Sequence, residues 1–524
     1  MKIAAIDLGS NSIHLVIVEV RPSGGFQVVA SEKAMVRLGA TTLSTGRLSA
    51  TAMARGLEVL REYRRLCRSH RVDKVLAVAT SAIREAKNGE DYLVRIGQKT
   101  GIWARVVSGV GEARLIYLAA LHSIHLEGKR ALVVDLGGGS LELALGTGTK
   151  PDWVASEKLG VLRLAGRFGG RDPLAGKDEE RLEAFVKQSL APHEKVVEAA
   201  RPFCVVATSG TILTLGRMAH QIETGEIPES LNHVTVKAQT LRELRERLCR
   251  LPLRERLRLP GMDGPRADIL PVGAVILDTV LRRLGLEELV LCEWALREGI
   301  LLDYILRHPR TLARAEAYPD VRRRSVMALA ERCQYDEAHA RHTAELALQL
   351  FDQTRARHAL GDGERALLEY AALLHDIGHH ISYPGHHKHT YYLIKNGDLR
   401  GFHPAEIEVL ANVARYHRRG HPKRKHPGFG SLPKESRRAV SVLAGLLRVA
   451  DALDRSHKQP VRRLLVGERG DAVRIQAEAR GDCELELWGV AGRLALFEEA
   501  LGVRARIETT AHLQSGARRA VLRA

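Results

Sequence analysis

Two short segments of the sequence combine an aspartate with a glycine-containing loop. Asp7–Ser12 reads Asp-Leu-Gly-Ser-Asn-Ser, and Asp135–Ser140 reads Asp-Leu-Gly-Gly-Gly-Ser. Glycine allows positive φ and a close backbone approach, so such loops expose amide groups that can surround an anion. Glu142 follows the second loop, and carboxylate oxygens suit a hard cation. These residue types predict a phosphate site in which Asp135 and Glu142 hold Mg²⁺, directly or through water.

The segments beside these loops predict strands that would position them. Ile3–Ile6 precedes the first loop and Leu15–Val18 follows it, while Leu141–Leu145 alternates apolar and polar residues after the second. A period of two indicates a strand, whereas a dinucleotide-binding loop or P-loop would lead into a helix. We therefore expect two β-hairpins, and two copies of one hairpin suggest two similar domains facing each other. The alternative for each copy is an ordinary turn rich in Asp and Gly.

Paired Asp-Leu-Gly hairpins resemble the actin/Hsp70/sugar-kinase superfamily. Together with three further segments they more closely resemble the exopolyphosphatase/guanosine pentaphosphatase (Ppx/GppA) phosphatase family. These segments are Ala79–Arg84, Ser108–Tyr117 and Leu296–Gly299. Each segment alone is weak, but the set is specific and extends from Asp7 to Gly299. The resemblance implies hydrolysis of a phosphoanhydride.

Glu112 matches the catalytic position of that family, and we interpret it as the general base. The family often has Glu-Glu-Ala where this chain has Gly111-Glu112-Ala113. The alternative is that Glu112 only favours a helix N-terminus. Arg84 can make a charge-assisted contact to phosphate. The alternative is that Arg84 is an ordinary helix arginine that faces solvent. The expected phosphate-binding residues are Gly9, Ser10, Asn11, Ser12, Ser81, Arg84, Gly137, Gly138, Gly139, Ser140, Ser209 and Gly210.

Histidines cluster in the second half of the chain. Ten of the 23 lie close together, namely His375, His379, His380, His386, His387, His389, His403, His417, His421 and His426. The order His…His-Asp…Asp resembles the HD phosphohydrolase superfamily, which implies metal ligands at His339, His375, Asp376 and Asp451. His386, His389 and His417 are candidates for a second metal. Mixed imidazole and carboxylate ligands suit Mn²⁺, Fe²⁺ or Mg²⁺ more than structural zinc. The alternative is a decayed HD fold without metal that forms a channel wall for polyphosphate.

Composition restricts the class of partner. The net charge is +18 and aromatic residues make up 4% of the chain. The positive net charge indicates an anionic partner. The alternative explanation is that the proteins of the source organism are basic in general. With so few aromatic residues a stacking platform for nucleic acid is not expected. No apolar run is long enough to span a bilayer and no signal-peptide core follows Met1, so we expect a cytoplasmic protein without a membrane partner. The six cysteines show no metal or disulfide spacing.

We therefore expect an α/β protein with four domains. Two ribonuclease-H-like (actin-like) domains are expected at residues 1–125 and 126–307, an all-helical HD-type domain at 318–458, and a small α+β domain at 461–524. A turn is expected at residues 22–25 and a linker around residues 308–320, where Pro and Gly interrupt the pattern. In the last domain the apolar pattern predicts strands at 473–477, 484–488 and 504–508 and a helix at 493–501.

The expected function is Mg²⁺-dependent release of orthophosphate from the end of inorganic polyphosphate. One alternative is a guanosine pentaphosphate (pppGpp) 5′-phosphohydrolase, and another is a polyphosphate or nucleotide sensor without turnover. A sugar kinase is disfavoured by the segments that contain Arg84 and Glu112. The HD-type domain is expected to bind Mn²⁺ or another divalent metal of its own. A homodimer is compatible with the sequence.

Overall fold

The structure is a computed structural model that describes residues 1–20, 26–126, 128–174, 176–308 and 320–511. The predicted turn at residues 22–25 lies outside the described residues, as does most of the predicted linker, residues 309–319. The chain folds as two compact units that divide between Val321 and Arg322. Among the described helices, none is long and apolar enough to cross a membrane. The boundaries of the four predicted domains stay predictions.

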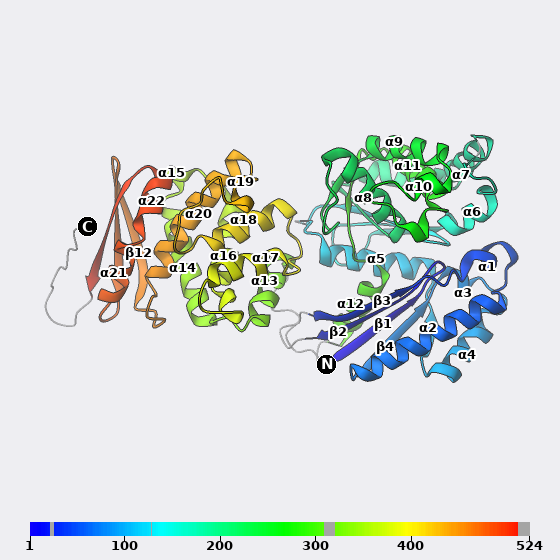
Figure 1. Ribbon diagram of the computed structural model, residues 1–524, viewed down its shortest axis with the longest axis horizontal. Coiled ribbons are helices and arrows are strands. Elements are labelled where there is room, and N and C mark those ends of the chain that lie inside the picture. Colours follow the sequence, from blue (N-terminus) through cyan, green and yellow to red (C-terminus); the bar gives the residue numbers. More distant parts are fainter. Residues whose placement is uncertain (21–25, 127, 175, 309–319, 512–524) are drawn as a thin grey trace. The chain divides into compact units, whose positions relative to one another are not determined.

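The first unit begins with a five-stranded sheet in the order β3-β2-β1-β4-β5. Its strands are β1 Lys2–Leu8, β2 Ile13–Val20, β3 Phe26–Ala34, β4 Lys74–Ala79 and β5 Ala104–Val106. β1 pairs antiparallel with β2 and parallel with β4, so the predicted hairpin after Asp7 is formed. The helix α2 (Ala50–Ser69) packs on β2 (Figure 1) and buries Leu57, Leu60 and Tyr63. Those residues recur every three positions, which places them on one helix face.

A second sheet repeats the same strand order. It runs β10-β11-β9-β6-β7-β8, so β6 pairs antiparallel with β7 and parallel with β9, as β1 does with β2 and β4. Its strands are β6 Ala131–Leu136, β7 Leu141–Gly146, β8 Trp153–Glu157, β9 Cys204–Thr208, β10 Thr235–Lys237 and β11 Glu288–Leu291. The repeated order confirms the expected pair of ribonuclease-H-like domains. β6 and β7 are buried throughout, as expected for central strands covered on both faces.

The remaining helices of this unit cover the two sheets. They are α1 Gly39–Thr45, α3 Ser81–Arg84, α4 Gly89–Thr100, α5 Gly109–Ser123, α6 Val161–Phe168, α7 Gly176–Ala200, α8 Gly210–Thr224, α9 Ala238–Arg250, α10 Leu253–Arg256, α11 Leu270–Arg283 and α12 Leu296–Arg307, with a 3₁₀ turn at Gly264–Arg266. α5 contacts β6, β7 and β8 of the second sheet, whereas α12 returns to contact β1 and β2 of the first. α5 and α12 also contact each other, so two packed helices cross between the halves.

The second unit begins with helices around one apolar core. They are α13 Val321–Arg332, α14 Glu337–Gln353, α15 Arg355–His358, α16 Asp362–Leu374, α17 His386–Lys395, α18 Pro404–Arg415, α19 Pro427–Gly430 and α20 Lys434–Ala452, with a 3₁₀ turn at Ile377–His380. α20 is nearly encircled by α14, α16 and α18. Its run from Val442 to Ala450 is accordingly buried on every side, including Arg448, which donates to backbone carbonyls of the segment after α18.

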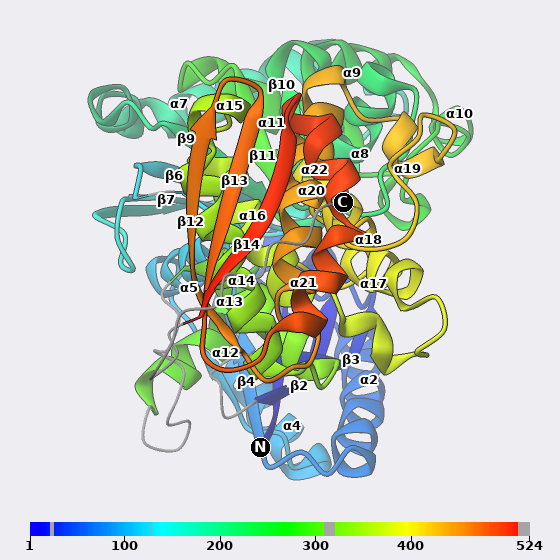
Figure 2. The same cartoon turned by 90° about the vertical axis from the view of Figure 1, so that its left-hand side faces the viewer.

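A small sheet with two helices follows. Its strands are β12 Val461–Arg469, β13 Ala472–Ala479 and β14 Arg504–Ala511, in that order, with α21 Glu484–Ala491 and α22 Leu494–Leu501 against β14 (Figure 2). The expected strand at 484–488 is wrong, because this segment is the first part of α21. The local alternation of Glu and Leu is misleading. Tertiary packing instead buries Leu487 and Val490, three positions apart and thus on one helix face.

Candidate functional sites

Two equivalent turns form the centre of the candidate active site in the first unit. The Gly9 amide donates to the Ser12 carbonyl at 3.1 Å, and the Gly137 amide donates to the Ser140 carbonyl at 2.9 Å. The first loop also reaches α3, since the Ser10 and Ser81 hydroxyl oxygens lie 2.8 Å apart. Gly139 of the second loop also lies against Ser81. A Cβ on Gly139 would lie 2.1 Å from the Ser81 hydroxyl oxygen, so only glycine fits there.

Cross-strand pairing places the acidic side chains on one face of each hairpin. Asp135 is directly opposite Glu142 in the β6–β7 pair, and Asp7 is opposite His14 in the β1–β2 pair. Directly paired residues project to the same face of a sheet. Glu142 is 2% exposed, and its Oε1 accepts a hydrogen bond from the Ser156 hydroxyl at 2.8 Å. The second hairpin thus supplies two carboxylates where the first supplies one.

Glu112 lies in the first turn of α5, where Ser108 caps the helix by accepting from the Gly111 amide. Its Oε2 is 3.2 Å from Nη1 of Arg84, and the same nitrogen donates to the Val107 carbonyl at 2.7 Å. Glu112 is 8% exposed. A buried carboxylate with one guanidinium partner is held in a fixed orientation. The two residues that the sequence picked out for catalysis and phosphate binding are therefore in contact.

The acidic side chains of this site repel one another. Burial, and next the charge of Glu112, raise the pKa of Asp7 from 3.8 to about 8 and that of Asp135 from 3.8 to about 7. Burial raises the pKa of Glu112 from 4.5 to about 7, although Arg84 opposes the rise. Burial together with Glu112 and Asp135 holds the pKa of Glu142 well above its usual range. These four buried carboxyl groups outnumber Arg84 and Arg297, the guanidinium groups that lower the pKa values of Glu112 and Asp7, and such an excess of buried negative charge favours a bound cation.

Two unpartnered oxygen atoms support the fit of a divalent cation. Asp7 Oδ1 and Glu142 Oε2 are buried without a hydrogen-bond partner. Carboxylate oxygens of this kind are the ligands that Mg²⁺ takes in proteins. Asp135 and Glu142 were expected as metal ligands from the sequence, whereas Asp7 was not. Its equivalence to Asp135 in the repeated Asp-Leu-Gly motif was the signal that could have identified it.

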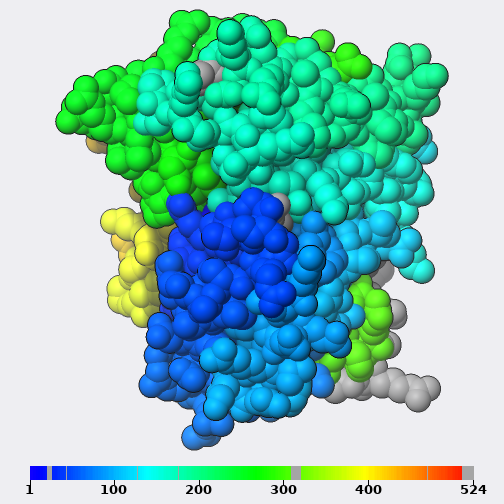
Figure 3. All heavy atoms as spheres, turned by 90° about the vertical axis from the view of Figure 1, so that its right-hand side faces the viewer, coloured from blue at the N-terminus to red at the C-terminus, as the bar shows by residue number. Residues whose placement is uncertain are grey.

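A pocket of about 350 Å³ opens over these groups. Of the expected site residues it is lined by Gly9, Ser10, Asn11, Ser12, Ser81, Glu112, Asp135, Gly137, Gly138, Gly139, Ser140, Ser209 and Gly210. Arg84 and Glu142 are not in the lining, and each reaches the site through its contacts with other residues. Sequence reasoning missed Lys33, His14 and Arg266 at the pocket wall, and it used Arg297 only as part of the segment Leu296–Gly299. The α1–α6 contact brings the two halves together at one end of this unit (Figure 3, blue against teal).

The far wall of the pocket contains a strained residue. Ser209 has φ of 100° and ψ of 155° while its hydroxyl caps α8 by accepting from the Ile212 amide. Only glycine adopts that region readily, and such strain persists where surrounding structure imposes it, often at functional sites. The Gly210 backbone is held beside Arg266. The loop therefore presents a fixed polar surface across from the two hairpins.

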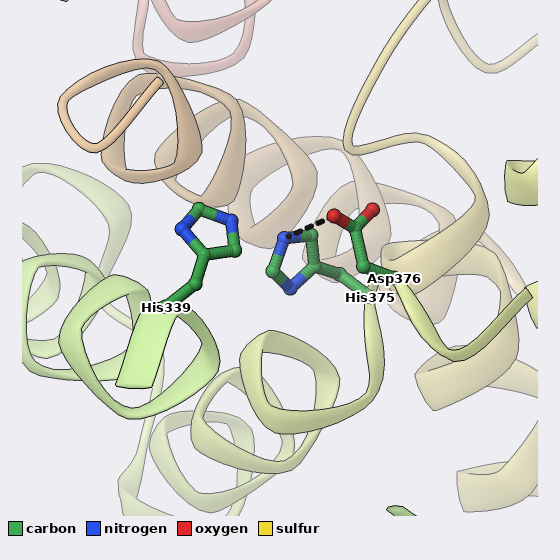
Figure 4. Close-up of side chains that lie close together, drawn as sticks. All are labelled: His339, His375 and Asp376. Atoms are coloured by element: carbon green, nitrogen blue, oxygen red, sulfur yellow. Dashed lines mark ion pairs between the residues drawn. The ribbon is translucent and has the colours of Figure 1, made fainter. Parts of the chain in front are cut away.

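A second cluster of polar side chains lies inside the helical unit. His339 comes from α14, while His375 and Asp376 follow α16 (Figure 4). His375 Nε2 lies 3.7 Å from Asp376 Oδ2 and 3.6 Å from Asp451 Oδ1, and His339 Nε2 lies 3.5 Å from the same Asp451 oxygen. Separate helices therefore bring together the four residues expected as ligands. The ligand role itself stays a prediction.

Asp376 faces a second group on its other side. Its Oδ1 is 3.1 Å from Nε2 of His386 and 3.5 Å from Nε2 of His417. Ligand atoms of Asp376, His386 and His417 all lie within 4.8 Å of one another, as do those of His339, His375 and Asp376. Neither group includes His389. Asp376 is the residue common to both groups, an arrangement that fits two neighbouring cations.

Hydrogen bonds at the other ring nitrogens direct the imidazoles toward this centre. Nδ1 of His375 is 2.7 Å from the Ala372 carbonyl, and Nδ1 of His417 is 2.6 Å from the Ala414 carbonyl. A ligating histidine usually donates its other N–H in this way, which leaves Nε2 free to bind metal. Nε2 of His339 and of His375 is buried without a hydrogen-bond partner. The donor set therefore fits a divalent metal.

Two further residues complete the surroundings of this centre and were not foreseen. Asp454 accepts from Nδ1 of His339 at 2.9 Å. Burial opposes protonation of His339, but the neighbouring carboxylates of Asp451 and Asp454 outweigh it and raise its pKa to about 10. Arg493, just before α22, forms an ion pair with Asp451. Asp454 follows Asp451 by one helical turn, a spacing that could have indicated its role.

Comparisons with known proteins agree with this geometry. The Ppx/GppA phosphatase family matches residues 16–308, and the Ppx/GppA phosphatase domain III matches residues 321–482. A crystal structure of an exopolyphosphatase from Cytophaga hutchinsonii is 30% identical, with a TM-score of 0.56 over 59% of this chain and 98% of that protein. A family member from Aquifex aeolicus is also 30% identical, with a TM-score of 0.51 over the same shares. The chain therefore belongs to the Ppx/GppA phosphatase family.

Proposed function

We propose that the first unit is a divalent-metal-dependent exopolyphosphatase that releases orthophosphate from the end of inorganic polyphosphate. The observation that carries this proposal is the contact between Glu112 and Arg84 at a pocket bordered by both glycine loops. Phosphoryl transfer requires a positioned phosphate, charge neutralisation and an oriented nucleophile. The amides of the two loops and Arg84 would position the phosphate. A cation at Asp7, Asp135 and Glu142 would neutralise its charge.

Glu112 supplies the third requirement. A water molecule beside its carboxylate attacks the terminal phosphorus, and the proton of that water passes to Glu112. The bond between the terminal phosphorus and the bridging oxygen breaks, and the bridging oxygen stays with the shortened chain. The pKa of Glu112, about 7, suits a general base that works near neutral pH.

The net charge of +18 supports polyphosphate as the substrate, because a long polyanion can contact many cationic side chains. Guanosine pentaphosphate is the alternative substrate, since it has the same terminal phosphoanhydride. A third possibility is a sensor that binds either molecule without turnover.

A phosphate-release assay with both substrates tests the proposal. Wild type should release phosphate from polyphosphate faster than from guanosine pentaphosphate, and Glu112→Gln should remove release while polyphosphate still binds. Glu90→Gln is the matched control, since Glu90 is an exposed acid in the first turn of α4. Wild-type turnover by Glu112→Gln would exclude Glu112 as base. Binding without turnover by wild type would indicate a sensor.

We also propose that the helical unit is a metal-dependent phosphohydrolase in its own right. The observation that favours it is Asp376, which lies between the His339–His375 group and the His386–His417 group. Imidazole and carboxylate donors together suit Mn²⁺ or Fe²⁺. A metal held by these residues would lower the pKa of a bound water and polarise a phosphoryl oxygen.

Metal analysis of the purified full chain tests the second proposal. Asp376→Ala removes the shared carboxylate and should abolish bound transition metal, because both groups lose a ligand. Asp471→Ala, at a surface aspartate of the same unit, should retain it. Polyphosphate hydrolysis should survive in both variants, because Glu112 and the two hairpins belong to the first unit. Equal metal content in Asp376→Ala and wild type would show that the cluster is structural.

A further inference from the structure

A separate hollow lies beside the candidate metal centre of the helical unit. It has a volume of about 490 Å³ and is formed by the start of α17 and the segment after α18. Its lining is Pro384, Gly385, His387, Lys388, Arg415, Tyr416, Arg418, Arg419, Gly420 and His426. Small-molecule sites in proteins enclose roughly 300–1,000 Å³, so this pocket has the size of a metabolite site.

The pocket is cationic and unbalanced. Lys388, Arg415, Arg418 and Arg419 line it, and no acidic residue does. Over the part of the chain that the structure describes, none of these four forms an ion pair with a carboxylate. Another pocket lined by arginines differs, because there Arg245 and Arg282 are paired with Asp278 and Glu183. Arg415 and Arg418 are half-buried and Lys388 and Arg419 are exposed. Cations that gather at one pocket without counter-charge favour an anion from outside the protein.

Arg418 connects this pocket to the metal centre. It lines the pocket, and its Nη1 lies 3.3 Å from Nε2 of His386. That His386 nitrogen is in turn 3.1 Å from Asp376 Oδ1. A guanidinium offers donors in a planar fork that matches the oxygens of a phosphoryl group. Arg418 can therefore contact a phosphoryl group that faces the metal centre while the remainder of the molecule occupies the pocket.

The backbone of the pocket is held in advance. Buried Arg448 donates from Nε to the Tyr416 carbonyl at 2.7 Å, and from Nη2 to the Arg419 and Gly420 carbonyls at 2.7 and 2.8 Å. The Arg415 guanidinium lies 5.2 Å from the Tyr391 ring centre, a cation–π distance. A site fixed before binding loses less entropy when its ligand arrives.

We propose that this pocket binds a phosphorylated small molecule, with Arg418 contacting the phosphoryl group next to Asp376 and His386. The proposal rests on the phosphohydrolase function proposed for the helical unit, and it names the substrate class of that centre. Two sources share the recognised chemistry, an organic phosphate such as a nucleotide and a short inorganic oligophosphate.

Site-resolved arginine modification of the full chain tests the pocket separately from the first unit, which also binds phosphate. Phenylglyoxal labels accessible arginines, and peptide mapping then reports each position. Adenosine monophosphate and tripolyphosphate, added in separate arms, should protect Arg415 and Arg418 but leave exposed Arg506 on β14 labelled as before. Protection by only one of the two identifies the source. Equal labelling of Arg415 and Arg418 with and without both anions would overturn the proposal.

Variants then distinguish this proposal from the function on which it rests. Arg418→Gln should weaken protection of Arg415 roughly ten- to a hundredfold, the loss expected for hydrogen bonds to a charged group. Arg418→Lys should recover part of it, and Arg506→Gln should change nothing. Protection that persists in Asp376→Ala while no phosphate ester is hydrolysed by wild type would support the pocket and refute the phosphohydrolase. Metal-dependent hydrolysis unaffected by Arg418→Gln would refute the pocket and support the phosphohydrolase.

Discussion

Asp135→Asn should stabilise the metal-free protein and at the same time reduce its stabilisation by Mg²⁺. Asp135 is 7% exposed, and its pKa is raised from 3.8 to about 7 by burial and by Glu112. A carboxyl whose folded pKa is raised is favoured in its neutral form. Its contribution to stability is therefore present below pH 4 and is lost as pH rises toward 7. Asparagine has the same shape and does not ionise.

The magnitude follows from the pKa. A rise of about three pH units at ~1.4 kcal/mol each corresponds to about 4 kcal/mol at pH 8. Part of this energy belongs to the repulsion by Glu112, which can take up a proton itself. An advantage on the order of 2 kcal/mol in the free energy of unfolding is therefore expected for the variant at pH 8 without metal.

Urea unfolding followed by tryptophan fluorescence measures this difference, because Trp103, Trp153 and Trp294 of the chain's four tryptophans are in the first unit. In the presence of a chelator, the difference in free energy of unfolding in favour of Asp135→Asn should grow from pH 5 to pH 8. When Mg²⁺ is added, the wild type should gain more stability than the variant. Asp91→Asn, at an exposed acid of α4, controls for the change in charge. A variant less stable than wild type at pH 8 without metal would refute the reasoning.

Three other outcomes are expected. Gly139→Ala should lower phosphate release at least tenfold, because its Cβ would meet the Ser81 hydroxyl and part the two loops; unchanged kinetics would mean that the loops need not approach. Polyphosphate affinity, measured by equilibrium binding, should fall steeply with added salt as counterion release predicts, and a flat dependence would exclude multiple cationic contacts. The rate of phosphate release should rise with pH up to about 7, because Glu112 loses its proton over this range. A bound metal should shift this rise to lower pH. A rate that falls over the same range would contradict the role of Glu112 as general base.

The parts of the site that are local in sequence could be predicted well. Asp-Leu-Gly-x-x-Ser between two strand-like segments indicates a hairpin, because glycine accommodates the close approach of the Ser12 carbonyl at Gly9 and of the Ser140 carbonyl at Gly137. The repeated motif was enough to predict the two domains, and the repeated strand order confirms them. Glu112 and Arg84 could be selected because each lies in a recognisable segment. Their 3.2 Å contact could not be foreseen, since it depends on how α3 and α5 pack.

Features that depend on packing between distant segments were missed. His386, His389 and His417 were predicted as candidates for a second metal, but nothing in their spacing indicates that His386 and His417 both face one oxygen of Asp376. Residues 484–488 alternate as a strand would, yet they form a helix because Leu487 and Val490 are buried together. The strain at Ser209 has no sequence signal, since serine is an ordinary residue for a helix cap.

The helix α5 has a mechanical consequence for the enzyme. Its first turn holds Glu112 against Arg84 of the first half, and a Cβ on Gly109 of the same turn would collide with Ser156 of the second half. The rest of α5 packs on the second sheet and on α12, which itself contacts the first. Separating the two halves would therefore move Glu112 away from at least one glycine loop. Such a widened pocket would lose the arrangement of Glu112, Arg84 and the two loops on which the proposed hydrolysis depends.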